Sequence, residues 1–132
     1  MIRRADHFLD FWHILDLTEE FNSKYYHKPL DKAKTSDMIS DIIEYGVCFV
    51  SDNGYIGGVV TPDPFRDANA LVELGWFAKD NSGIKLLDAF IAEGRELGVD
   101  EIRMCTMSTS PVIAEKIILR KGFTVAETQY RL

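Results

Sequence analysis

The chain has 132 residues, of which 46% are hydrophobic and 27% charged, and its formal net charge is −6. This length suits a single domain over 1–132, and no apolar run approaches the roughly 20 residues of a membrane-spanning helix. The negative charge argues against a nucleic-acid partner, because binding to phosphate groups needs a basic face. The N-terminus lacks the apolar segment of a signal peptide, so we expect a cytoplasmic protein.

The first third of the chain predicts a strand and two helices. Residues 1–5 can form the short strand. Apolar side chains at helical spacing predict a helix from Asp6, which suits an N-cap, to about Asn22. A second helix is expected to begin near Ser36 and to end at Gly46.

An Asn-Gly pair predicts a β-hairpin in the middle of the chain. Residues 47–52 and 55–61 are rich in strand-forming side chains, and Asn53-Gly54 lies between them. This dipeptide favours two-residue hairpin turns, because both positions tolerate a positive φ. A loop at 62–69 then leads to the next strand.

The most informative stretch runs from Ala70 to Leu87. An apolar strand there ends in a tight Asn81-Ser82-Gly83 turn, and a helix begins directly behind it. The first N–H groups of such a helix lack partners, and its dipole adds partial positive charge, so the turn suits a phosphate group. An ordinary strand-to-helix turn, with Gly83 chosen for its backbone freedom, explains the same residues.

One carboxylate, Glu73, lies inside this otherwise apolar strand. Because Val72 and Leu74 flank it, desolvation can raise its pKa toward the range of a general base at neutral pH. Alternatively, the alternation of the strand turns Glu73 to solvent or into a salt bridge. Trp76 and Phe77 must face opposite sides of the sheet, where each packs in the core or lines a pocket.

The remaining residues predict two strands separated by a helix. The strands are expected at 101–105 and 123–130. Between them, Ser110-Pro111 is typical of a helix start, with serine as N-cap, and Gly122 ends the helix. The full order is β-α-α-β-β-β-α-β-α-β, which predicts an α/β fold whose mixed sheet carries helices on both faces.

The cysteines and histidines lack the spacing of a metal site. Cys48 and Cys105 have no CxxC spacing and are expected to be reduced core residues. His7 and His13 fall on different sides of the first predicted helix, and His27 falls in a predicted loop. We therefore expect no metal.

Four short motifs follow one another from the middle of the chain to its end. They are Glu73-Leu74-Gly75-Trp76, Ser82-Gly83-Ile84-Lys85-Leu86-Leu87, Arg103-Met104 and Glu127-Thr128-Gln129-Tyr130. Together with the element order, they resemble the GCN5-related N-acetyltransferases (GNAT family) over nearly the whole chain, and most closely the compact phage and bacterial members. The resemblance implies a GNAT-like fold and a cytoplasmic enzyme, in the host cytoplasm if a phage encodes it. It implies direct transfer of an acetyl group from acetyl-CoA to an amine of a small molecule or protein, by a monomer or homodimer.

The resemblance also implies roles for individual residues. Glu73 takes the position where the family often keeps its general base. Phe77 and Ala78 match the strand segment whose backbone binds the pantetheine arm. The N–H groups that would hold the pyrophosphate are those of Ser82, Gly83, Ile84 and Lys85.

Two departures from the family pattern bear on activity. The phosphate-binding turn is shorter than the usual Arg/Gln-x-x-Gly-x-Gly/Ala, with Ala78 at the Arg/Gln position and Asn81 at the middle glycine. Many members carry a tyrosine, as general acid toward the departing thiolate, where this chain has Ile118. Tyr130 and Ser108 are the candidates to replace that tyrosine. The alternative function is therefore a catalytically degenerate binding or virion-associated module without turnover.

Overall fold

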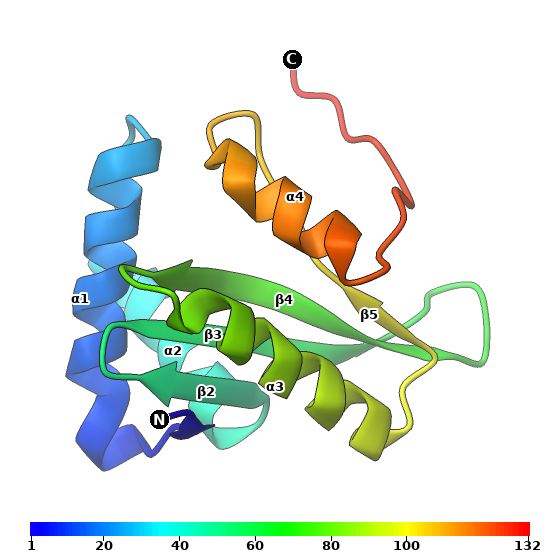
Figure 1. Cartoon of the computed structure of the whole chain (residues 1–132), viewed down its shortest axis with the longest axis horizontal. Helices are drawn as coiled ribbons and strands as arrows, with labels where there is room; N and C mark the ends of the chain where they lie inside the picture. Colours follow the sequence, from blue (N-terminus) through cyan, green and yellow to red (C-terminus); the bar gives the residue numbers. More distant parts are fainter.

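Five strands form one mixed sheet in the computed structural model, which describes all residues from 1 to 132 (Figure 1). The sheet order follows the chain, and neighbouring strands are antiparallel except for the parallel pair β4 and β5. The strands are β1 (Arg3–Arg4), β2 (Val47–Ser51), β3 (Gly54–Pro62), β4 (Asn69–Ala78) and β5 (Glu101–Arg103). The predicted α/β class with a mixed sheet is confirmed.

Four helices cover the two faces of this sheet. They are α1 (His7–Tyr25), α2 (Lys32–Glu44), α3 (Ser82–Leu97) and α4 (Val112–Arg120). None of them combines the length and the apolar character that crossing a bilayer requires. The parallel connection from β4 to β5 passes through α3, as such connections need a crossover.

The buried apolar side chains form two clusters, one on each face. The first cluster joins α1 and α2 to the sheet through Ile14, Leu15, Leu17, Ile39, Ile42, Cys48, Val50 and Tyr55. The second joins α3 and α4 to the other face through Val47, Ile56, Leu71, Leu86, Leu87, Phe90 and Ile118. Burial of these side chains is the main favourable contribution to folding.

The helix starts are partly as predicted. Asp6 is the N-cap of α1, since its carboxylate accepts a hydrogen bond from the N–H of Leu9 at 3.0 Å. The helix α2 begins earlier than expected, because Asp31 caps it in the same way through the N–H of Lys34. Ser110 is not the N-cap of α4; its Oγ instead accepts from the N–H of Met107 in the preceding turn.

The predicted hairpin forms, but with a shifted turn. Gly54 pairs with Ser51, so the loop consists of Asp52 and Asn53 rather than Asn53-Gly54. No residue other than a glycine has a positive φ, and Gly54 itself does not. A Cβ at Gly54 would lie 2.7 Å from the Cβ of Ala78, so the close approach of β4 explains the glycine better than turn geometry does.

The expected final strand at 123–130 is wrong. Those residues form no regular secondary structure, and every residue after Phe123 is exposed. A strand needs a partner for its backbone hydrogen bonds. The sheet offers little here, because β5 spans only Glu101–Arg103 instead of the predicted 101–105.

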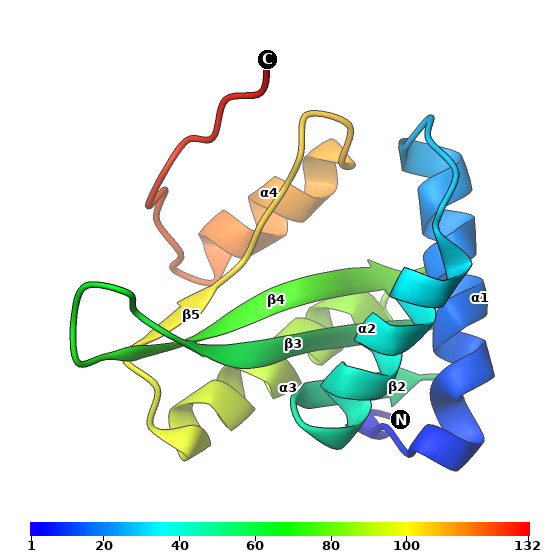
Figure 2. The same ribbon diagram turned by 180° about the vertical axis from the view of Figure 1, so that it is seen from behind.

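A β-bulge and a divergence of strands mark the middle of β4. Gly57 pairs with Gly75 and Gly58 with Glu73, so Leu74 is an extra residue in β4. Pairing of β4 with β5 ends at Val72, directly before the bulge. Beyond that point the two segments separate (Figures 1 and 2). We call the region between residues 73–78 and residues 104–110 the fork.

Candidate active site

Glu73 lies where the fork opens. Its side chain is half-buried, and its Oε1 accepts a hydrogen bond from the N–H of Cys105 at 3.3 Å. Burial raises the pKa of Glu73 to about 7, although the bond from Cys105 works in the opposite direction. No lysine or arginine pairs with it, so the salt-bridge alternative does not apply. This carboxylate can therefore exchange a proton at neutral pH.

Aromatic side chains gather near this position on the α1 side of the sheet. Phe77 of β4 lies 5.2 Å, between ring centroids, from Phe21 of α1. Phe21 also contacts Tyr25 and Tyr26, at 5.0 and 5.5 Å. We call Phe21, Tyr25, Tyr26 and Phe77 the aromatic cluster. The buried hydroxyl of Tyr55, which accepts from Thr18 at 3.0 Å, lies against the backbone at Gly75.

Trp76 and Phe77 face opposite sides of the sheet, as predicted. Trp76 packs against the second cluster and Phe77 against the first. The side of β4 that faces the fork has free backbone groups, because no main-chain hydrogen bond links β4 beyond Val72 to the segment after β5. The residues expected to contact pantetheine differ here: the N–H of Lys79 bonds to Asn53 of the hairpin loop, so by alternation the main chain of Phe77 faces Tyr55 of β3 and that of Ala78 faces the fork.

The N-terminus of α3 offers free donors. The N–H groups of Gly83, Ile84 and Lys85 have no acceptor in the protein. Lys85 is exposed and makes no ion pair, so its ammonium adds positive charge beside these amides. Such a group of donors at the start of a 16-residue helix suits an anion.

The fourth expected donor, the N–H of Ser82, is already engaged. It donates to Oδ1 of Asp80 at 2.9 Å, and the Ser82 hydroxyl donates to the same oxygen. Asn53 donates to the other carboxylate oxygen at 3.1 Å. These bonds, those from Ser82 first, hold the pKa of Asp80 below its usual value. A carboxylate therefore occupies part of the predicted phosphate site.

Neither candidate general acid forms a hydrogen bond with Glu73. Tyr130 is 92% exposed in the segment after α4. Ser108 is exposed in the loop between β5 and α4 and makes no side-chain hydrogen bond. Ile118 is buried in the second cluster, so its place in α4 is a packing position.

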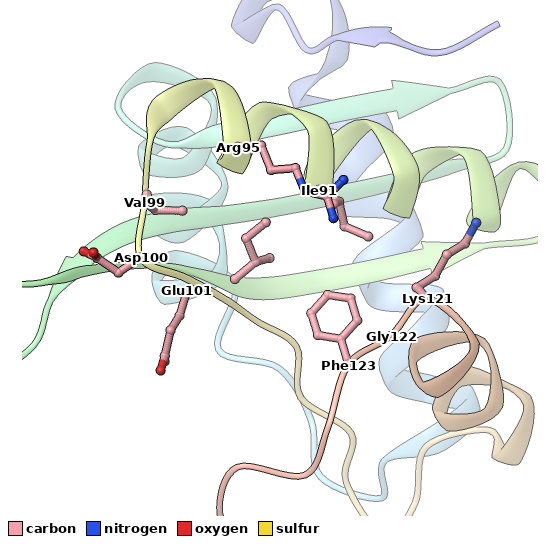
Figure 3. A pocket seen from close by; sticks show the side chains of 9 residues that line it. Ile91, Arg95, Val99, Asp100, Glu101, Lys121, Gly122 and Phe123 are labelled. Carbon is pink, nitrogen blue, oxygen red and sulfur yellow. The ribbon is translucent and has the colours of Figure 1, made fainter.

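A cleft of about 270 Å³ lies at the other end of α3 (Figure 3). The ring of Phe123 points into it toward Ile91, and Arg95 lies on its α3 side. Lys121, which also borders it, forms an ion pair with Asp88 of α3 at 2.7 Å. No predicted site residue lines this cleft.

Three residues that were not predicted to belong to the site meet at the start of α3: Asp80, Asn53 and Ser51. Ser51 Oγ lies 2.7 Å from Ser82 Oγ. Because the Ser82 proton goes to Asp80, Ser51 is the donor in this contact. An Asp shortly before a helix start is a standard capping signal and was available in the sequence.

No family model and no curated protein matches the chain. Solved structures match along all of it. A mutant protein from Bacillus halodurans has a TM-score of 0.82 at 12% identity, with coverage of 100% of this chain and 98% of the other. A predicted acetyltransferase with acetyl-CoA from Clostridium acetobutylicum has a TM-score of 0.79 at 11% identity, with 100% and 94% covered.

A third similar structure is that of AAC(6′)-Iy in complex with a bisubstrate analogue, CoA-S-monomethyl-acetylneamine. Its TM-score is 0.75 at 18% identity, with 100% of this chain and 95% of the other covered. At these identities the likeness shows the fold. The chain thus has the acetyltransferase fold that its resemblance to the GNAT family implied, and the expected fold is confirmed.

Proposed function

We propose that the protein is an acetyl-CoA-dependent N-acetyltransferase that works by direct transfer to an amine. The observation that carries this proposal is the position of Glu73 at the opening of the fork. Its carboxylate bonds across the fork to the N–H of Cys105, forms no ion pair, and has a pKa that burial raises to about 7. A general base is most effective when its pKa lies near the working pH.

The residues around the fork fit acetyl-CoA in two respects. The free backbone groups of β4 at Ala78 can bind an amide of the pantetheine arm, and the side chain of the neighbouring Phe77 lies on the α1 side of the sheet. The three free N–H groups of α3, at Gly83, Ile84 and Lys85, can hold the pyrophosphate. Bound there, acetyl-CoA would supply a thioester as acyl donor.

The chain's own contribution to the reaction is positioning and proton transfer. Glu73 removes a proton from the acceptor ammonium, whose ordinary pKa is near 10.4, and so provides the neutral amine. The free N–H groups on β4 face the fork and can stabilise negative charge on the acyl oxygen. Since Ile118 is buried and the candidate acids Tyr130 and Ser108 are both exposed to water, we assign protonation of the leaving thiolate to solvent.

A small-molecule amine is the favoured acceptor class. The bisubstrate analogue in the AAC(6′)-Iy structure joins CoA to such an amine. In this chain, the faces of Phe21, Tyr25, Tyr26 and Phe77 can attract a cation and pack against its apolar part. An amine on a protein is the second acceptor class.

The alternative is a binding module without turnover. The carboxylate of Asp80 at the start of α3 favours it, because a fixed negative charge there opposes a pyrophosphate. In that case Glu73 would have no catalytic part.

Calorimetric titration with acetyl-CoA, with CoA in parallel, tests the cofactor. Micromolar binding would support the proposal, and its absence at millimolar cofactor would contradict it. Acetylation of a panel of amines from pH 6 to 9 then tests the base. We expect the rate to rise through pH 7 for the native protein. Glu73→Gln should remove this rise and most of the rate; unchanged turnover would contradict the role of Glu73.

A further inference from the structure

Asp80 is held by donors that are well suited to a phosphate oxygen. The N–H and O–H of Ser82 both point at its Oδ1, and the amide of Asn53 donates to its Oδ2. The hydroxyl of Ser51 donates to the hydroxyl oxygen of Ser82, with 2.7 Å between the two oxygens. The two residues that bind Asp80 come from separate places in the fold, the hairpin loop and the first residue of α3. Yet the side chain they bind is exposed and belongs to the turn itself.

We infer that Asp80 is an internal anion that fills part of the phosphate site in the free protein and leaves it when a diphosphate binds. This inference rests on the proposed function, because it names a residue that weakens binding of the proposed cofactor. It assigns Asp80 a role that opposes ligand binding.

Charge and hydrogen bonding support this competition. A carboxylate and a phosphate both accept charge-assisted hydrogen bonds from N–H and O–H donors, so each can satisfy Ser82 and Asn53. The carboxylate of Asp80 and a phosphate held by the same donors would repel each other. The helix dipole favours whichever of the two anions lies at the helix end. When Asp80 turns outward, no donor stays unsatisfied, because the phosphate takes its place.

Competition with Asp80 also makes the site selective for ligands that carry several negative charges. A monoanion such as acetate offers no more charge than Asp80 itself and gains nothing by displacing an intramolecular group. A diphosphate can contact the Ser82 donors and the free amides of Gly83, Ile84 and Lys85 together. Only a multiply charged ligand can therefore displace Asp80.

Asp80→Asn tests the inference, because the amide oxygen can still accept from Ser82 while the charge is lost. The matched control is Asp37→Asn, which removes one exposed carboxylate from α2, on the opposite face of the sheet, where Asp37 makes no hydrogen bond or ion pair. CoA and inorganic pyrophosphate are the two probes, titrated into each folded protein by calorimetry. Thermal unfolding without ligand provides the second readout.

We expect Asp80→Asn to bind both probes about tenfold more tightly than the native protein, and Asp37→Asn to bind them like the native protein. The ligand-free Asp80→Asn protein should not be more stable, since its capping bonds are weaker. A cap without a competing role would instead give lower stability and equal or weaker binding, which would overturn the inference.

The two probes separate this inference from the proposed function. Equal CoA binding by the native protein and Asp80→Asn would overturn the inference and leave the enzyme proposal standing. Tighter pyrophosphate binding by Asp80→Asn, with no CoA binding by either protein, would support the inference and contradict the enzyme proposal. Failure of both probes with both proteins would overturn both.

Discussion

The indole N–H of Trp76 donates a hydrogen bond to the carbonyl oxygen of Gly83 at 3.0 Å. Trp76 lies near the end of β4, and Gly83 is the second residue of α3. The bond therefore spans the turn between strand and helix and fixes the first amides of α3 relative to the free edge of β4. The backbone at Gly83 is helical, with no positive φ, so its lack of a side chain is not needed for the turn.

Gly83→Ala should consequently separate binding from stability. A Cβ there would lie 3.4 Å from the Cβ of Ala78, an ordinary contact, and alanine favours a helix by up to about 1 kcal/mol over glycine. We expect unchanged or higher stability in urea denaturation. CoA affinity should fall roughly tenfold, because a methyl group would obstruct the approach of a phosphate to the backbone.

The control for this substitution is Gly94→Ala in the same helix. A Cβ at Gly94 would lie 2.7 Å from a side-chain carbon of Ile102, so the variant should lose about 1–3 kcal/mol of stability. Its CoA affinity, measured on the folded protein, should not change. Native-like CoA affinity of Gly83→Ala would mean that the phosphate does not bind at these amides.

Glu73→Gln should stabilise the protein at alkaline pH. The pKa of Glu73 in the folded state, about 7, lies above the ordinary value of 4.5, so the folded state binds the additional proton between these two values. Stability of the native protein therefore falls as pH rises from 4.5 to 7, and the loss is complete above pH 7. We expect Glu73→Gln to be more stable by about 1–3 kcal/mol at pH 8 and nearly equal at pH 4. Urea denaturation at the two pH values measures this difference; a constant difference would contradict it.

Asp10→Ala should destabilise the protein in the opposite pH range. The carboxylate of Asp10 is buried, and it binds Arg3 through two hydrogen bonds of 2.7 Å and the N–H of Asp6 through a third. The bond from Arg3 is the main reason that the pKa of Asp10 is lowered from 3.8. Its contribution is thus complete above pH 3.8 and is lost as pH falls through the lower folded pKa.

For this variant we expect a loss of about 2–3 kcal/mol at pH 7 and a smaller loss at pH 3, measured by urea denaturation. Asp37→Asn, at an exposed position of α2, is the control and should behave like the native protein. An equal loss for Asp10→Ala at both pH values would show that packing, and not the ionised carboxylate, is responsible.

Only one of the two thiols should react in the native protein. Cys105 is exposed, whereas Cys48 is buried and burial raises its pKa to about 12. Burial, and then the charge of Glu73, raise the pKa of Cys105. We therefore expect a disulfide reagent to modify one thiol, faster in Glu73→Gln than in the native protein at pH 8. Cys105→Ser should abolish the reaction; equal rates would place Glu73 away from Cys105.

Local patterns in the sequence were sufficient to predict most of the fold. The cap at Asp6, the opposite orientations of Trp76 and Phe77, and the mixed sheet all follow from rules about neighbouring residues. The prediction of a final strand at 123–130 was wrong because a strand needs a partner strand. The sequence does not reveal that β5 ends at Arg103. Cys105 was expected in the core but follows that early end and is exposed.

The candidate site was predictable only in part. Glu73 stood out because a lone carboxylate in an apolar strand is unusual, and the free amides followed from the helix start. The contact of Asp80 with Asn53 was not predictable, because it joins two turns that are distant in the sequence. Whether a glycine serves a turn or a close packing contact, as at Gly54, also depends on a neighbouring strand.

Because β4 and β5 pair over a short length, the part of the chain that follows β4 and α3 should open more easily than the rest of the molecule. Residues from 101 onward are joined to the rest of the molecule by three residue pairs between β4 and β5, by the bond from Cys105 to Glu73 and by the ion pair of Lys121 with Asp88. A few side chains, such as Ile118 and Phe123, add packing contacts. Amide hydrogens in α4 should therefore exchange with deuterium through opening of this part alone, well before those of β2 and β3. A molecule that spans the fork would link the two parts and slow exchange in α4, at a distance from its own contacts.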